Sequence, residues 1–148
     1  MSISTTYTTE IIVPKPQIEE HKGNIKGTLC MEIMGLALAK IAKEHQGRVN
    51  EGYSDCSGQH HPCVFGLATP ALPNGIGIEV NETGRVIFCY DSSGADMMKI
   101  TRLCDDIARA YATIAVMRIR NRHGYRVEIE EDVSTSSGRR VSTMAIRS

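Results

Sequence analysis

Two hydrophobic periodicities divide this chain into predicted strands and helices. Apolar or β-branched residues at every second position predict strands, because alternate side chains of a strand face the same side of a sheet. This alternation predicts a first strand over residues 3–13, which ends at Pro14 because proline has no N–H to donate to a neighbouring strand. Weaker patterns predict short strands over 49–53 and 64–68. The segment between them, SDCSGQHHPC, is too polar for a regular element.

The clearest strand prediction is a hairpin in the middle of the chain. Apolar residues alternate with small or polar ones over 76–80 and again over 86–90, and Asn81–Gly84 supplies the turn between them. Alternation over 125–129 and a weaker apolar pattern over 141–146 predict a second hairpin around a polar turn.

Apolar residues at spacings of three and four predict two long helices. The first covers residues 28–46, with Thr28 as its N-cap and a glycine just past its end. The second opens near Ser93, which has capping-box spacing to Asp96, and runs to about His123.

The predicted order of elements is β-α-(β-β)-β-β-α-β-β. Hairpins interrupted by two amphipathic helices favour an α+β fold, in which an antiparallel sheet carries both long helices on one face. A ferredoxin-like split arrangement is the most economical version of this fold. We find no internal repeat and no low-complexity linker, so residues 1–148 are interpreted as a single domain.

Amino-acid composition indicates which class of molecule the protein binds. The 148 residues are 41% hydrophobic and 23% charged, which fits one globular domain of ordinary size. Lys plus Arg and Asp plus Glu are equal at 17 each, and a net charge of zero argues against a nucleic-acid-binding protein. Two Phe and no Trp leave little aromatic surface for base stacking. We therefore expect a protein partner or self-association, and the sequence indicates no particular small-molecule ligand.

Targeting signals and cysteine usage indicate a compartment. The N-terminus has neither the basic nor the apolar region of a signal peptide. The longest apolar stretch, 29–42, is interrupted by Glu32 and Lys40, so no membrane span is expected. Five cysteines without an export signal fit a reducing environment, and we expect a cytoplasmic protein.

The strongest chemical signal is a compact Cys/His loop. Four metal-binding side chains stand within eight positions: Cys56, His60, His61 and Cys63. Such donors suit Zn²⁺ or Fe²⁺, and because adjacent histidines rarely bind one ion, the expected set is both cysteines and one histidine. A tetrahedral site would need a fourth ligand, with three candidates elsewhere in the chain: Cys30, Cys89 and Asp55.

Other interpretations of the loop stay open. Cys56 and Cys63 could form a reversible disulfide, or the loop could be a polar surface turn with incidental donors. A Cys or Ser nucleophile needs an oriented base, and neighbours in a loop are no evidence of one, so no catalytic residue is assigned. The remaining cysteines fall within or beside apolar patterns and are expected in the core: Cys30, Cys89 and Cys104.

A succession of motifs in the C-terminal half is similar to a known family. It consists of GIGIEVNETGRVIFCYD, a helix containing ITRLCDDIARAYATIAVMRIRNRHGY, and VEIEEDV before a polar turn and a last strand. Ala110-Tyr111 and Gly124-Tyr125 stand within it, and a Thr-Thr pair begins the N-terminal strand. This succession resembles the plastid and cyanobacterial reading-frame family often called ycf-thirty-five-like, whose bacterial relatives form a domain of unknown function. The resemblance implies no activity and no catalytic residues. The Cys/His loop and the apolar first helix depart from the family's pattern.

Two functions follow as hypotheses. The first is a non-enzymatic accessory or interaction domain in a homo- or hetero-oligomeric assembly, because the fold is well patterned, no catalytic constellation stands out, and edge strands invite pairing. The second is a metal-binding (Zn or Fe) or redox-responsive protein that uses the Cys56–Cys63 loop.

Overall fold

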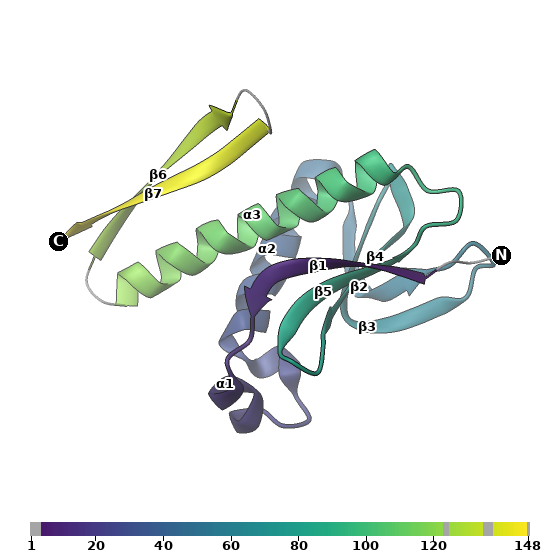
Figure 1. The fold of residues 1–148 in the computed structure, drawn as a ribbon, viewed down its shortest axis with the longest axis horizontal. Coiled ribbons are helices and arrows are strands. Elements are labelled where there is room, and N and C mark those ends of the chain that lie inside the picture. Colours follow the sequence, from purple (N-terminus) through teal and green to yellow (C-terminus); the bar gives the residue numbers. More distant parts are fainter. Residues whose placement is uncertain (1–3, 123–124, 135–137, 148) are drawn as a thin grey trace.

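A computed structural model describes residues 4–122, 125–134 and 138–147, with side chains through Arg118. The elements follow one another as β1 (Ser4–Ile12), α1 (Lys15–Glu20), a 3-10 turn (Ile25–Gly27), α2 (Leu29–His45), β2 (Arg48–Ser54), β3 (His60–Thr69), β4 (Leu72–Val80), β5 (Arg85–Asp91), α3 (Met97–Arg122), β6 (Tyr125–Ser134) and β7 (Gly138–Arg147) (Figure 1).

The main sheet has five antiparallel strands in the order β1-β5-β4-β3-β2. Strands β2 to β5 form a meander, because short turns join each strand to the next. In the predicted turn at Asn81–Gly84, the Asn81 side chain accepts hydrogen bonds from the main-chain N–H groups of Thr83 and Arg85. The α+β fold is confirmed. A ferredoxin-like sheet would alternate strands from two β-α-β halves, so the observed strand order departs from that version of the prediction.

Both long helices cover the same face of this sheet. One row of directly paired residues crosses four strands: Tyr7, Phe88, Ile78 and Phe65. Paired residues of neighbouring strands share a face. At one end of this row Phe65 lies against Gly35 of α2, and at the other the Tyr7 hydroxyl donates to Asp105 of α3. The prediction that both helices lie on one face is therefore confirmed.

The core lies between the helices and this row. Its largest fully buried side chains include Met31, Met34 and Leu38 of α2, Ile107 of α3, and Leu67, Ile76, Ile78 and Phe88 of the sheet. At the start of α2, Thr28 accepts a hydrogen bond from the Met31 N–H, as its predicted capping role requires.

Two helix ends differ in detail from the predictions. The residue in left-handed conformation after α2 is Gln46 (φ 55°) rather than the following Gly47. Gly47 instead permits a close approach, because a Cβ there would overlap the carbonyl oxygen of Ala68. Helix α3 begins at Met97, and the Asp96 carboxylate accepts from the next N–H groups of its first turn.

The last two strands form a separate hairpin. β6 and β7 pair in continuous register from Tyr125–Arg147 to Ser134–Gly138. Figure 1 shows this hairpin beyond the C-terminal half of α3, on the side of that helix away from β1. Within the described residues, no helix is long and apolar enough to span a membrane.

Candidate functional site

The predicted Cys/His loop is shorter than its sequence suggests, because β3 already begins at His60. Asp55 organises the remaining turn. Its Oδ1 accepts from the Ser57 N–H at 2.9 Å, the Ser57 hydroxyl at 2.5 Å and the Gln59 N–H at 3.0 Å. Its Oδ2 accepts from His61 Nε2 at 2.9 Å. The hydrogen bonds from Ser57 and His61 lower the pKa of Asp55 to about 2, so its carboxylate is ionised at neutral pH.

Tyr53 links this turn to β1, the strand at the opposite edge of the sheet. Its ring stacks on the His61 imidazole with centroids 4.9 Å apart and an angle of 11° between the planes. The Tyr53 hydroxyl shares a 3.1 Å hydrogen bond with Ser4 Oγ of β1. Because β1 and β2 are opposite edges of the sheet, this bond means that the sheet curls at this end until its edges meet.

The curl depends on close packing of main chain between β2 and β3. The register between these strands is irregular between Asn50 and Gly52. A Cβ on Gly66 would overlap the carbonyl oxygen of Gly52, so only glycine fits at that position. At the end of the curl, the Cys56 N–H donates to Asp91 Oδ2 of β5 at 2.7 Å.

The four predicted metal-binding side chains have different surroundings. Cys56 is exposed in the turn, His60 is exposed at the start of β3, and His61 faces Asp55 and Tyr53. The Cys63 thiol donates to the main-chain oxygen of His61 at 3.6 Å. Within the described residues, no three His, Cys, Asp or Glu side chains converge in the manner of a metal site.

The protonation of Cys63 also bears on its chemistry. Burial, followed by the nearby Glu79 carboxylate, raises the pKa of the Cys63 thiol to about 12. Metal ligation and disulfide exchange both use the thiolate, which is scarce at this pKa. The metal and disulfide hypotheses stay predictions. Elemental analysis of anaerobically purified protein, with Cys56→Ser and Cys63→Ser for comparison, is their direct test.

The other three cysteines divide between the two faces of the sheet. Cys30 and Cys104 are buried in the core, as predicted. The prediction that Cys89 lies in the core is wrong, because this residue is half-buried on the opposite face: it follows core-facing Phe88 and pairs with Gly77. Burial also raises the pKa of Cys89. The thiols of Cys63 and Cys89 are therefore not activated, and the contacts of Asp55 and His61 serve to fix the curled end of the sheet.

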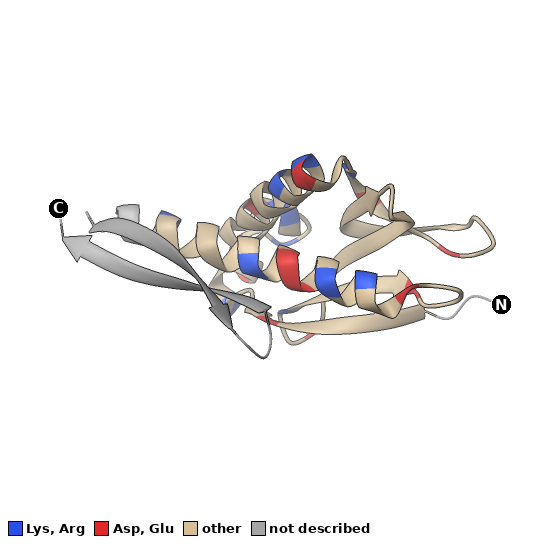
Figure 2. Ribbon diagram, turned by 90° about the horizontal axis from the view of Figure 1, so that it is seen from above, with Lys and Arg blue, Asp and Glu red and all other residues tan. Residues whose placement is uncertain are grey.

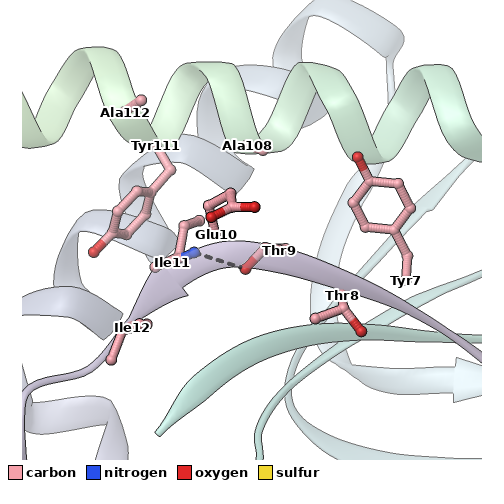
Figure 3. A pocket seen from close by; sticks show the side chains of 9 residues that line it. All are labelled: Tyr7, Thr8, Thr9, Glu10, Ile11, Ile12, Ala108, Tyr111 and Ala112. Atoms are coloured by element: carbon pink, nitrogen blue, oxygen red, sulfur yellow. Dashed lines mark hydrogen bonds between the residues drawn. The ribbon is translucent and has the colours of Figure 1, made fainter.

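A second candidate site is a groove of about 490 Å³ between β1 and α3 (Figure 3). One wall is the run of β1 from Tyr7 to Ile12, and the other is the side of α3 that carries Ala108, Tyr111 and Ala112. The two alanines lie one helical turn apart on the same side of α3, and their small side chains leave the space of the groove unfilled.

One end of the groove is polar and the other is apolar. At one end the Tyr7 hydroxyl donates to Asp105 Oδ1 at 2.5 Å, and its ring stacks on Phe88. The bond to this carboxylate, with burial, raises the pKa of Tyr7 to about 12. At the other end Ile12 is 52% exposed, and burial raises the pKa of the nearby Tyr111. Both tyrosines therefore keep their protons at neutral pH.

The β1 wall of the groove is also an edge of the sheet. Among the described strands, β1 pairs with β5 and with no other. The register with β5 is irregular between Thr8 and Ile12, where Thr9 Oγ1 accepts from the Ile11 N–H at 3.1 Å (Figure 3). The same hydroxyl donates to the main-chain oxygen of Val86 in β5 at 2.6 Å. Sequence reasoning missed this groove because strand order decides which strand lies at an edge. The spacing of Ala108 and Ala112 is the one local signal that could have indicated it.

Comparison with known proteins gives no further identification. No protein-family model matches the chain, and no significant match is found among curated proteins or solved structures. The resemblance to the ycf-thirty-five-like family therefore stays a prediction.

Proposed function

We propose that this protein is a non-enzymatic accessory domain, which binds an extended segment of a protein partner by adding it to β1. The observation that carries this proposal is the groove that has the open edge of β1 as one wall and α3 as the other. A strand edge presents unpaired N–H and C=O groups, and these bind an incoming strand in the same way as a neighbour within the sheet.

The lining of the groove supports this kind of ligand. An added strand points alternate side chains to opposite sides, so every second side chain would enter the space beside α3. That space is lined by Ile11, Tyr111 and the two alanines, which suit an apolar side chain. The exposed carboxylate of Glu10 provides one charge at the rim, where it would favour a basic partner residue.

The chemistry of the groove supports binding over catalysis. Its tyrosine hydroxyls are held in the protonated form, and the one at Tyr7 already donates to Asp105. Basic and acidic residues are interspersed along α3 (Figure 2), and Arg109 lies 3.7 Å from Asp106 one turn away. This mixed charge means that α3 itself favours neither a basic nor an acidic partner, which leaves Glu10 of β1 as the charged residue among those that line the groove.

The test is purification of tagged full-length protein from its native host under native conditions. Three versions are compared: wild type, Ala112→Arg, which fills the groove from an exposed helical position, and Thr101→Arg as its control on the same helix outside the groove. We expect wild type and Thr101→Arg to be isolated in a stoichiometric assembly that Ala112→Arg loses. A strictly monomeric protein without a stoichiometric partner, or an assembly that Ala112→Arg leaves intact, would refute the proposal.

A further inference from the structure

We infer that the segment bound in the groove is β7 of a second copy of this chain, an inference that rests on the proposed function. Two parts of the described chain have strand edges without a neighbouring strand. β1 has an open edge, and the β6–β7 hairpin is a two-stranded sheet with an outer edge on each strand. The hairpin packs against α3, and its outer edges stay available to a further strand.

The arrangement within one chain leaves both elements available to a neighbour. The hairpin stands beyond the C-terminal half of α3 and on the side of that helix away from β1 (Figure 1). It therefore does not pair with β1 of its own chain. β1 offers the segment 5–12, beyond the end where Ser4 meets β2, and the ten residues of β7 are enough to span it.

Charge decides which strand of the hairpin fits. The sequence of β7 contains three arginines and no acidic residue: Arg139, Arg140 and Arg147. The sequence of β6 contains four acidic residues and one arginine. Because Glu10 lines the groove and Asp105 lies beside its Tyr7 end, the basic strand is favoured and the acidic one disfavoured.

Exchange of hairpins between two copies makes a closed dimer. Each copy gives β7 to its partner and receives the partner's β7 in its own groove, so the same contact occurs twice about a two-fold axis. The groove is then incomplete in a single chain, and the joined sheet has the former β1 edge in its interior.

The first test is the mass of purified full-length protein by native mass spectrometry and light scattering. We expect twice the 16.3 kDa of one chain. Ala112→Arg, and separately Arg139→Glu with Arg140→Glu, should each weaken the dimer about a hundredfold, because a clash or a like-charge contact at an interface costs several kcal/mol. Thr101→Arg and Glu19→Lys are exposed controls outside the groove and should leave the dimer unchanged. Thermal unfolding by circular dichroism verifies that each variant is folded.

Mixing the two weakened variants gives the decisive result. Chains with Ala112→Arg keep a normal β7, and chains with Arg139→Glu and Arg140→Glu keep an open groove. An equal mixture should therefore form a heterodimer with one intact contact, while neither variant dimerises alone at the same concentration. A monomeric wild type, a dimer insensitive to Ala112→Arg, or a mixture without heterodimer would overturn the inference.

The mass of purified wild type and the composition of the assembly from the host together distinguish failure of the second-copy inference from failure of the proposed function. If purified wild type is a monomer but the assembly from the host contains another protein that Ala112→Arg loses, the bound strand belongs to that partner. The proposed function then stands and the second-copy inference fails. If Ala112→Arg changes neither result, both fail.

Discussion

Cys63 gives the most direct chemical test of the curled end of the sheet. Its thiol is half-buried beside Tyr53 and Gly77, donates to the main-chain oxygen of His61, and lies near Glu79. Burial and this carboxylate both disfavour the thiolate, and they raise the pKa of Cys63 to about 12. We therefore predict that Cys63 in the folded protein reacts slowly with an alkylating agent such as iodoacetamide.

The expected decrease in the alkylation rate depends on two opposing quantities, the fraction of Cys63 that is thiolate and the nucleophilicity of that thiolate. At about pH 8, a free cysteine with a pKa of about 8.5 is roughly one-quarter thiolate, whereas a thiol with a pKa of about 12 is roughly 1 part in 10⁴ thiolate. The more basic thiolate is also the better nucleophile, and a Brønsted slope of about 0.4–0.5 recovers roughly 40-fold of this roughly 2,400-fold difference. The expected rate is therefore about 60-fold below that of free cysteine, and steric shielding lowers it further.

The assay is peptide mass spectrometry of the alkylated full-length protein over time, with glutathione in the same tube as the rate standard. Unfolding in denaturant provides the control, because it should bring the rate at Cys63 close to the standard. Alkylation of folded Cys63 within about fivefold of glutathione would show that the thiol is not shielded as described, and the account of the curled end would be wrong.

Three further predictions concern stability. Asp55→Asn removes a carboxylate whose pKa is lowered from 3.8 to about 2 in the folded protein, so the stability that this carboxylate contributes is present above about pH 4 and is lost as the pH falls towards 2. The variant should therefore be less stable than wild type at neutral pH, and this difference should shrink with acid in a circular-dichroism titration. Gly66→Ala should lower the free energy of unfolding in urea by about 1–3 kcal/mol, because its Cβ would meet main-chain atoms that cannot move aside, whereas Gly35→Ala should raise it by about 0.5–1 kcal/mol, because a Cβ in the middle of α2 makes only an ordinary contact with Phe65. Equal effects of the two substitutions would contradict this packing. Tyr7→Phe should cost about 1 kcal/mol through the lost bond to Asp105. Because the pKa of Tyr7 is raised from 10.0 to about 12, that difference from wild type should persist below pH 10.0 and disappear as the pH rises through about 12.

The elements that sequence reasoning identified correctly are those that local pattern determines. The hairpin around Asn81–Gly84 has both alternation and a turn whose asparagine binds its own main chain. The first long helix has its predicted cap at Thr28, and the second is displaced only at its start, which lies at Met97, where Asp96 accepts from the first turn. Short-range hydrogen bonds and side-chain periodicity are sufficient for such assignments.

The errors arise where contacts distant in sequence decide the structure. The segment His60–Cys63 looks like a polar loop, yet it belongs to β3 because it pairs with the end of β2. That pairing depends on the approach of Gly66 to the main chain of Gly52 and on the bond from Tyr53 to Ser4, 49 residues away. The strand order that leaves β1 at an edge, and therefore creates the groove, has no local signature either.

The central claim is that β1 receives a strand from another chain, and hydrogen exchange at its main-chain amides tests this most directly. Full-length protein in its isolated assembly is compared with dilute purified protein, and exchange is followed by mass spectrometry in the peptide that covers 4–12. We predict slower exchange across this peptide in the assembly, because added-strand hydrogen bonds protect N–H groups that are otherwise open to water. Unchanged exchange in β1, with protection confined to other parts of the chain, would contradict the account.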